Sequence, residues 1–179
     1  MTKSITLAIT GSISAYKAAD LTNRLIKLGY DVHVLMTESA TKFITPLTLQ
    51  VLSKKPVYLD VMKEETPNII NHIDIGKQTD LFLVAPASAN TIAHLAHGFA
   101  DNMVTATALA LPLSVSKLIA PAMNTKMYNN PLTQRNLTTL KEIGYQVIEP
   151  RTSQLACGDI GRGALAELDV IIEAVQRII

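Results

Sequence analysis

Short apolar runs alternate with stretches of helical periodicity along the chain, and this alternation restricts the fold more than any other feature. The runs have the length and β-branched content of buried strands, whereas the longer stretches repeat their apolar residues every three or four positions. The pattern predicts one α/β domain, residues 1–179, with a doubly wound, flavodoxin/Rossmann-like parallel sheet and helices on both faces. Expected strands are residues 4–10, 31–36, 57–59, 81–85, 116–120 and 146–148, and expected helices are 14–28, 48–52, 90–97, 103–109, 131–143 and 168–178.

Residues 150–163 depart from this pattern. They include Pro150 and three glycines, Gly158, Gly161 and Gly163, and they show little periodicity. We therefore expect an irregular, mobile loop there rather than a further strand or helix.

Polar residues follow the expected strands directly, at the end of the sheet where such folds bind their ligands. The groups are Gly11-Ser12 and residues 37–39, 86–90 and 121–124. Gly11 permits close backbone approach, and the start of the next helix offers N–H groups and a positive dipole end, which suit a phosphate. The turn has neither the GxGxxG pattern nor the ending of a P-loop, which disfavours a dinucleotide. Ser12 or Ser39 alone is more simply a helix N-cap, but the two together favour a monophosphate site.

The composition of the chain excludes several classes of function. A net charge of +1 without a basic run argues against a nucleic-acid partner. No apolar stretch has membrane-spanning length and the N-terminus has no signal-peptide pattern, so we expect no membrane association and a cytoplasmic location. The single Cys157 rules out an internal disulfide and a multi-cysteine metal site. A hydrophobic content of 48% predicts apolar surface that other subunits cover.

Five sequence motifs occur in a specific order, and each is weak when taken alone. Together they resemble the flavoprotein cysteine decarboxylases over nearly the whole chain. One departure is Tyr128, where tryptophan often follows in that family. The motifs are residues 11–17 (GSISAYK), His72-Ile73, residues 86–91 (PASANT) with Gly98 and residues 100–102 (ADN), residues 121–127 (PAMNTKM), and residues 155–163 (LACGDIGRG).

The resemblance implies FMN as the cofactor and decarboxylation of 4'-phosphopantothenoylcysteine to 4'-phosphopantetheine, a step of coenzyme A biosynthesis. In the implied reaction the flavin oxidises the substrate to a thioaldehyde, carbon dioxide leaves, and the enethiol is reduced again. It also implies a homo-oligomer, a trimer or a dodecamer of trimers. No synthetase domain follows Ile179, so we expect a separate synthetase chain to supply the substrate. The flavin contacts fall on Gly11, Ser12, Ile13, Ser39, Phe43, Ser88, Ala89, Asn90, Thr91 and Ala122.

Catalytic roles are implied for His72, Asn124 and Cys157, and each has a simpler alternative. His72 suits a base or an orienting group near neutral pH, although a lone histidine is usually a surface or interface residue. The Asn124 amide can donate hydrogen bonds to the substrate carboxylate, or it can cap the turn that follows it. Cys157 can deliver a proton from a loop that closes over the substrate, although a lone cysteine is usually buried in the core.

The remaining site residues concern the substrate and metals. Arg162 is expected to help hold the phosphate tail of the substrate, on its position in the loop alone. His94 and His97 have no third ligand at a fitting spacing, so no metal site is expected. The implied substrate contacts are Asn124, Ala156, Cys157, Gly158 and Arg162.

Other functions on the same fold remain as alternatives. A peptidyl-cysteine decarboxylase would share the flavin site, His72 and Asn124, but the residues around Cys157 favour the coenzyme A enzyme. A flavin prenyltransferase is not expected to combine His72 with Cys157. A non-catalytic regulatory flavoprotein typically carries acidic extensions, and a flavodoxin-like electron carrier is typically acidic and shorter.

Overall fold

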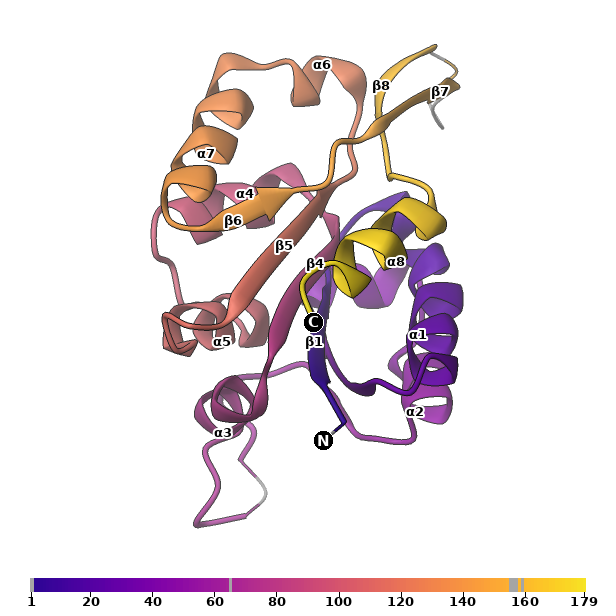
Figure 1. Ribbon diagram of the computed structural model, residues 1–179. Helices are drawn as coiled ribbons and strands as arrows, with labels where there is room; N and C mark the ends of the chain where they lie inside the picture. Colours follow the sequence, from indigo (N-terminus) through magenta and orange to yellow (C-terminus); the bar gives the residue numbers. More distant parts are fainter. Residues whose placement is uncertain (1, 65, 155–157, 159) are drawn as a thin grey trace.

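The computed structural model describes residues 2–64, 66–154, 158 and 160–179. Its main sheet has six parallel strands in the order β3-β2-β1-β4-β5-β6 (Figure 1). This confirms the predicted doubly wound α/β fold, and the strand order is that of the Rossmann arrangement. The strands are β1 (Ser4–Ile9), β2 (Asp31–Met36), β3 (Val57–Tyr58), β4 (Leu81–Ala87), β5 (Ser116–Pro121) and β6 (Tyr145–Val147).

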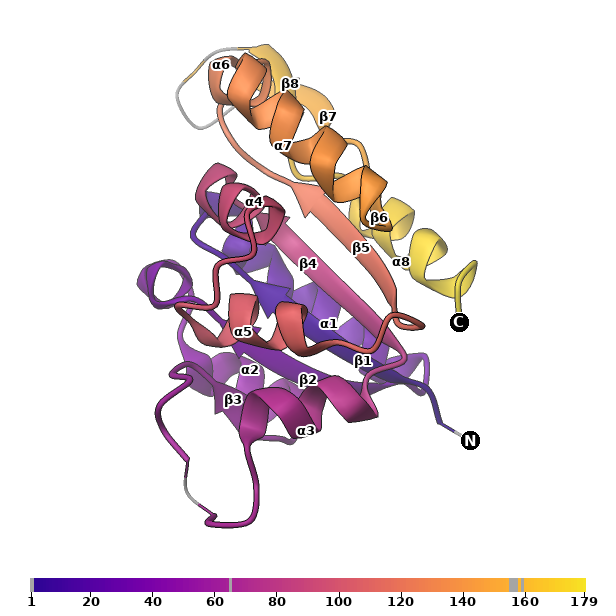
Figure 2. The ribbon, with the colours of Figure 1, turned by 90° about the vertical axis from the view of Figure 1, so that its left-hand side faces the viewer.

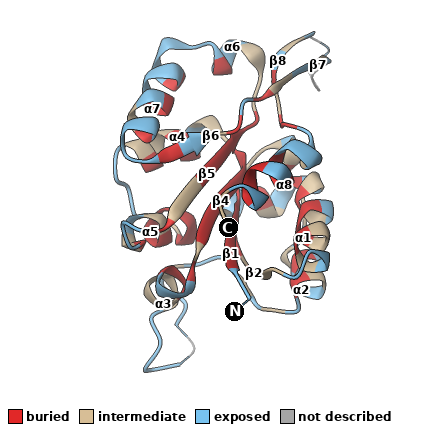
Figure 3. Cartoon of the chain, in the orientation of Figure 1, coloured by how far each residue is buried: buried red, intermediate tan, exposed pale blue. Residues whose placement is uncertain are grey.

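Helices cover both faces of the sheet (Figure 2). One face carries α1 (Ala18–Lys27), α2 (Pro46–Ser53) and α8 (Leu168–Gln176), and the other carries α3 (Asn71–Gln78), α4 (Ala89–Ala96), α5 (Met103–Ala110) and α7 (Pro131–Glu142). Alternate residues of β1 divide between the two cores, with Leu7 on the first face and Ala8 on the second. Because the central strands are buried on both faces, they appear in the sequence as continuous apolar runs (Figure 3).

Local signals in the sequence place most helix ends. Gly29, with φ +90°, follows the end of α1, and Asn102 caps α5 by accepting hydrogen bonds from the backbone of Val104 and Thr105. The helix predicted at residues 14–28 is divided into a 3-10 turn, η1 (Ile13–Lys17), and α1. A second 3-10 turn, η2 (Glu38–Lys42), follows β2. None of the helices in the described part of the chain is long and apolar enough to cross a membrane.

Two segments differ from the sequence prediction. Residues 71–78 form α3, where the sequence predicts no helix. Only Ile75 and Gly76 of α3 are buried, so the helix has no apolar stripe that would repeat in the sequence. The prediction of an irregular loop at residues 150–163 is wrong where the chain forms two strands. There β7 (Arg151–Gln154) pairs antiparallel with β8 (Ile160–Ala164). The glycine-rich β8 is a strand only because β7 supplies its hydrogen-bonding partner, which local periodicity does not reveal.

The strand order reverses between β1 and β4, and Thr10 joins the ends of these two strands. Its buried hydroxyl donates to the carbonyl oxygen of Pro86 at 2.8 Å and accepts from the backbone N–H of Ser88 at 2.8 Å. In sheets of this type, ligands bind in the crevice beyond such a reversal point. Thr10 therefore fixes the geometry of the place where a ligand site is expected.

Candidate active site

A cavity of about 480 Å³ lies beyond the carboxyl ends of β1, β4 and β5. Its wall comes from the turn after β1, the start of α4, the turn after β5 and the β7–β8 hairpin. The described residues that line it are Gly11, Ser12, Ile13, Ser14, Tyr16, Lys17, Phe43, Ser88, Ala89, Ala122, Met123, Asn124, Met127, Arg151, Gln154, Gly163, Ala164 and Leu165.

The turn after β1 forms the first wall of the cavity. Ser12 caps η1, and its Oγ accepts a hydrogen bond from the Ser14 backbone at 3.3 Å. A Cβ atom on Gly11 would lie 2.5 Å from the Cβ of Ser39, so this position has no room for a side chain. Gly11 thus allows the turn to lie directly against the end of β2.

The start of α4 forms the second wall. The Oγ of Ser88 accepts from the backbone N–H of Thr91 at 3.2 Å, while Ala89 begins the helix beside the cavity. A helix start carries backbone N–H groups without intrahelical partners and the positive end of the helix dipole. Two helix starts, of η1 and of α4, therefore meet at one cavity, and this arrangement suits an anionic group.

Asn124 lines the same cavity and also caps a short helix, α6 (Thr125–Tyr128). Its Oδ1 accepts a hydrogen bond from the Lys126 backbone at 2.8 Å. Of the two alternatives for Asn124, the structure shows the turn cap, and it places the same residue in the cavity lining, while binding of a substrate carboxylate stays a prediction. The cap holds the side chain of Asn124 against the start of α6.

The β7–β8 hairpin lies next to α6 (Figure 1), and residues of both of its strands line the cavity. The backbone N–H of Met123 donates to the carbonyl oxygen of Gly163 at 2.9 Å, which ties β8 to the turn that carries Asn124. Part of the segment predicted to clamp the substrate, in particular Gln154 and Gly163, therefore lines the cavity. Ala156 and Cys157, which come between β7 and β8 in the sequence, lie outside the described residues.

Arg162 and Gly158 do not line the cavity. An Nη atom of Arg162 donates to Glu149 Oε2 at 2.8 Å, and the guanidinium lies 5.6 Å from the centroid of the Tyr128 ring. The Tyr128 hydroxyl donates to the same carboxylate oxygen at 2.8 Å. Burial, together with this carboxylate, raises the pKa of Tyr128 to about 12. These contacts tie β8 to α6, which is a structural connection rather than a cavity contact.

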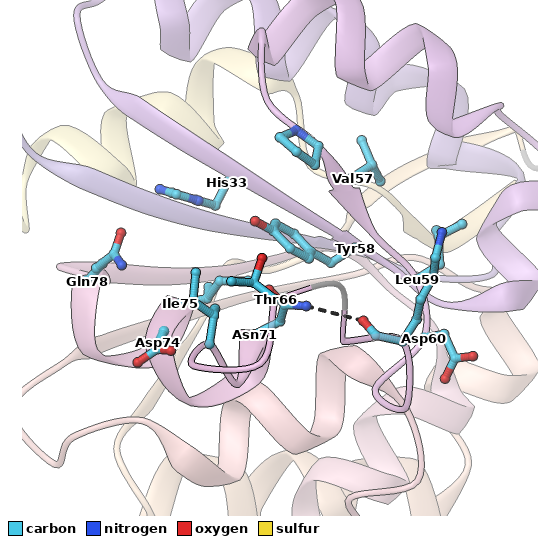
Figure 4. Close-up of a pocket in the computed structure, with 13 residues that line it drawn as sticks. His33, Val57, Tyr58, Leu59, Asp60, Thr66, Asn71, Asp74, Ile75 and Gln78 are labelled. Atoms are coloured by element: carbon cyan, nitrogen blue, oxygen red, sulfur yellow. Dashed lines mark hydrogen bonds between the residues drawn. The ribbon is translucent and has the colours of Figure 1, made fainter.

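His72 lies in α3, away from the cavity that contains Asn124. Its helix neighbours Asn71 and Asp74 line a second cavity, of about 390 Å³, beneath the segment that follows β3 (Figure 4). The Nδ1 of His72 is buried without a hydrogen-bond partner in the described part of the chain, and it lies 4.0 Å from Glu64 Oε1. The described chain therefore does not bring His72 to its own Asn124.

The predicted flavin contacts fall into two sets. Gly11, Ser12, Ile13, Phe43, Ser88, Ala89 and Ala122 line the cavity. Ser39, Asn90 and Thr91 do not, although Ser39 packs against Gly11 and the Thr91 hydroxyl bonds to Ser88 at 3.2 Å.

Sequence reasoning assigned no role to several residues that line the cavity. Lys17 belongs to the first motif, and that position could have indicated a place in the site. No sequence pattern indicated a site position for Arg151 or Gln154, because the sequence did not predict their strand, β7. The other residues of this kind are Tyr16, Met123, Met127, Ala164 and Leu165.

The whole chain matches one protein family. The match is to the Flavoprotein family and extends over residues 1–179. The chain belongs to this family. Among its Flavoprotein relatives, a probable phosphopantothenoylcysteine decarboxylase of Streptococcus mutans is 67% identical over 177 residues, which covers 99% of each chain. The coenzyme A biosynthesis bifunctional protein CoaBC of Bacillus subtilis is 46% identical over 175 residues, which covers 98% of this chain and 43% of that protein.

Solved structures of Flavoprotein type superpose on the whole chain. A PPC decarboxylase in complex with pantothenoylaminoethenethiol, a cysteine-to-serine variant, matches with a TM-score of 0.91 and 32% identity, covering 99% of this chain and 98% of that one. The FMN binding protein AtHal3 matches with a TM-score of 0.87 and 33% identity, covering 99% and 96%. The comparisons confirm the resemblance to the decarboxylases that the motifs indicated.

Proposed function

We propose that this protein catalyses the FMN-dependent decarboxylation of 4'-phosphopantothenoylcysteine to 4'-phosphopantetheine in coenzyme A biosynthesis. The observation that carries the proposal is that Asn124 lines the same cavity as the two helix starts at Ser12 and Ser88. A group able to orient a carboxylate thus lies beside a place suited to a cofactor phosphate. The 67% identity to a probable phosphopantothenoylcysteine decarboxylase supports the same substrate.

The residues of the cavity fit FMN. The hydroxyls of Ser12 and Ser88 and the N–H groups at the starts of η1 and α4 suit a monophosphate. Ile13 and Phe43, which are 55% and 46% exposed, offer apolar surface for a flat ring system. Bound FMN would supply a reversible acceptor for the hydride of the substrate C–S unit, and this makes loss of carbon dioxide possible.

Asn124 would orient the substrate carboxylate through its amide N–H groups. A neutral amide holds a carboxylate less firmly than an arginine would, and it therefore favours the reactant less strongly over the product, which has lost this carboxylate. The α6 cap holds Asn124 in place without any contribution from the substrate. The site is thus preorganised on the side of the carboxylate.

His72 would act on the cavity of another copy of the chain, as a base or an orienting group. This assignment is supported by its position in α3, away from its own Asn124, and by its buried Nδ1, which has no hydrogen-bond partner among the described residues. A homo-oligomer, either a trimer or a dodecamer of trimers, would bring the two residues together. Exposed apolar side chains such as Leu47 and Val51, at 66% and 67%, are suited to contacts between subunits.

Cys157 would provide the proton that completes the reduction of the enethiol product. It lies in sequence between β7 and β8, and both strands contribute residues to the cavity wall. Ala156 and Gly158 would contact the substrate from the same turn. A thiol is a far stronger acid than the hydroxyl of serine, which explains the choice of residue.

The substrate would come from a synthetase activity carried by a separate chain, in the cytoplasm. The relative from Bacillus subtilis is named a bifunctional protein of coenzyme A biosynthesis, and this chain matches 43% of its length. The rest of that protein leaves room for its second function.

The test is carbon dioxide release by the purified protein with FMN bound. We expect yellow protein that releases non-covalent FMN on denaturation and converts 4'-phosphopantothenoylcysteine to a product lighter by one carbon dioxide. A peptide with a C-terminal cysteine, offered in parallel, tests the peptidyl-cysteine alternative. Protein that does not bind FMN, or that decarboxylates only the peptide, would refute the proposal.

A further inference from the structure

The charged residues that line the candidate active-site cavity are all of one sign. Of the described residues that line it, Lys17 and Arg151 alone carry a charge at neutral pH, and both are cations. No described carboxylate lines the cavity, whereas Asp20, Glu167 and Asp169 line a neighbouring groove that also includes Lys17. Anionic ligands are therefore favoured near Arg151 and Lys17.

Arg151 is held in place by one part of its guanidinium. The Nε atom donates to the carbonyl oxygen of Leu165 at 3.2 Å and lies 3.1 Å from Glu167 Oε1. Neither Nη atom has a hydrogen bond with the described residues, and Glu167 is the carboxylate paired with this guanidinium. The side chain is 37% exposed, so solvent or a ligand reaches it. An arginine fixed at Nε with two Nη groups remaining suits an oxygen-rich anion such as a phosphate.

Arg151 belongs to the substrate part of the cavity rather than to the proposed cofactor phosphate position. The start of α4, with Ser88, offers backbone N–H groups and a hydroxyl, whereas Arg151 begins the hairpin. The hairpin is joined to the turn before Asn124 by the bond between Met123 and Gly163. Arg151 and Asn124 therefore lie on parts of the wall that are connected directly to each other.

We propose that Arg151, assisted by Lys17, binds the phosphate of the substrate and sets the preference for a phosphorylated thiol acid over its dephosphorylated form. This inference rests on the proposed function and replaces the assignment of the phosphate to Arg162. The Arg162 guanidinium is engaged by Glu149 and stacks over Tyr128, outside the lining of the cavity.

The test compares kcat/KM for 4'-phosphopantothenoylcysteine and for pantothenoylcysteine in four proteins. These are the wild type, Arg151→Gln, Arg162→Gln, and Arg177→Gln as a control for the loss of an exposed charge, just after the end of α8. Arg151→Gln should lower kcat/KM for the phosphorylated substrate about 10- to 100-fold, mainly through KM, and leave the value for the dephosphorylated substrate nearly unchanged. Arg162→Gln and Arg177→Gln should keep the wild-type ratio of the two values.

Binding of the products provides a readout that does not depend on turnover. Calorimetry should show that Arg151→Gln weakens binding of 4'-phosphopantetheine and not of pantetheine. Arg151→Lys keeps the positive charge and should restore part of the preference for the phosphorylated substrate that Arg151→Gln loses. Circular dichroism of each variant shows whether it is folded. If Arg151→Gln keeps the wild-type ratio of the two kcat/KM values, or if Arg162→Gln lowers that ratio instead, this inference is wrong and the proposed function still stands. Wild-type protein that decarboxylates neither substrate would refute the proposed function and this inference with it.

Discussion

The backbone N–H of Met123 donates a hydrogen bond of 2.9 Å to the carbonyl oxygen of Gly163. The two residues are forty positions apart, and their contact joins the turn before Asn124 to strand β8. A Cβ atom on Gly163 would overlap the carbonyl oxygen of Met123. The close approach of the hairpin to the active-site turn therefore requires glycine at this position.

Replacing Gly163 with alanine should separate β8 from this turn. We expect a loss of about 1–3 kcal/mol in the free energy of unfolding, because the added methyl group meets rigid backbone, together with a marked loss of turnover. Urea unfolding and the carbon dioxide assay measure the two effects. Gly144→Ala is the matched control, since Gly144 also has a positive φ, of 94°, but has open space around its Cβ position. It should lose stability and keep its activity when folded. Equal activity in both variants would contradict the role given to this contact.

Replacing Gly11 with alanine should weaken FMN binding about 10-fold or more, because the new methyl group would displace the turn from Ser39 and shift the phosphate position. Fluorescence titration with FMN measures the change. The double variant Gly11→Ala/Ser39→Gly removes the colliding atom and should recover most of the affinity. A double variant as weak as the single one would show that the close approach is not the cause.

Asn124→Asp should abolish most turnover without loss of stability. Aspartate caps a helix as well as asparagine does, but its negative charge repels the substrate carboxylate. The matched control is Asn130→Asp, because Asn130 caps α7 through the same kind of bond, to the Leu132 backbone at 2.9 Å, and does not line the cavity. Both variants should unfold at the wild-type temperature, and only Asn124→Asp should be inactive. A near wild-type rate in Asn124→Asp would remove Asn124 from the mechanism.

Mixed oligomers should show whether His72 serves another copy of the chain. We expect His72→Asn and Asn124→Asp to be inactive when pure, and to regain part of the activity when they are unfolded and refolded together. A mixed interface would combine an intact His72 from one subunit with an intact Asn124 from the next. Recovery is measured against each variant refolded alone. If refolded mixtures that contain both subunits have no activity, His72 acts within its own chain or has no role.

Folding stability should depend on pH through His33. Burial, with the neighbouring Lys55 ammonium, lowers the pKa of His33 below its ordinary value of 6.5. The unfolded chain then binds this proton at a pH where the folded chain does not, so the free energy of unfolding falls as the pH decreases below about 6.5. His33→Gln should reduce this dependence when urea unfolding is measured between about pH 5 and 8. His97→Gln, which removes an exposed imidazole, serves as the control. An unchanged slope in His33→Gln would place the pH dependence elsewhere.

The sequence by itself determined the sheet and the position of the ligand end. The run at residues 4–10 holds no charged residue and is mostly apolar because β1 is buried on both faces, and that property is visible within the run itself. Gly11, Ser12, Ser88 and Asn124 were found for a similar reason. Each follows a strand directly, and in a parallel sheet all carboxyl ends meet at one edge.

Only the tertiary structure decided which of these residues share a cavity. His72 and Asn124 belong to one set of motifs, yet α3 holds His72 away from the cavity that Asn124 lines. Lys17 and Arg151 lie far apart in the sequence and line the same cavity. Arg151 reaches it because β7 pairs with β8, which is bonded to the turn before Asn124. The periodicity of apolar residues indicates which face of a helix or strand is buried. Which distant elements come into contact depends on pairing and packing between them, and short-range patterns carry no record of those contacts.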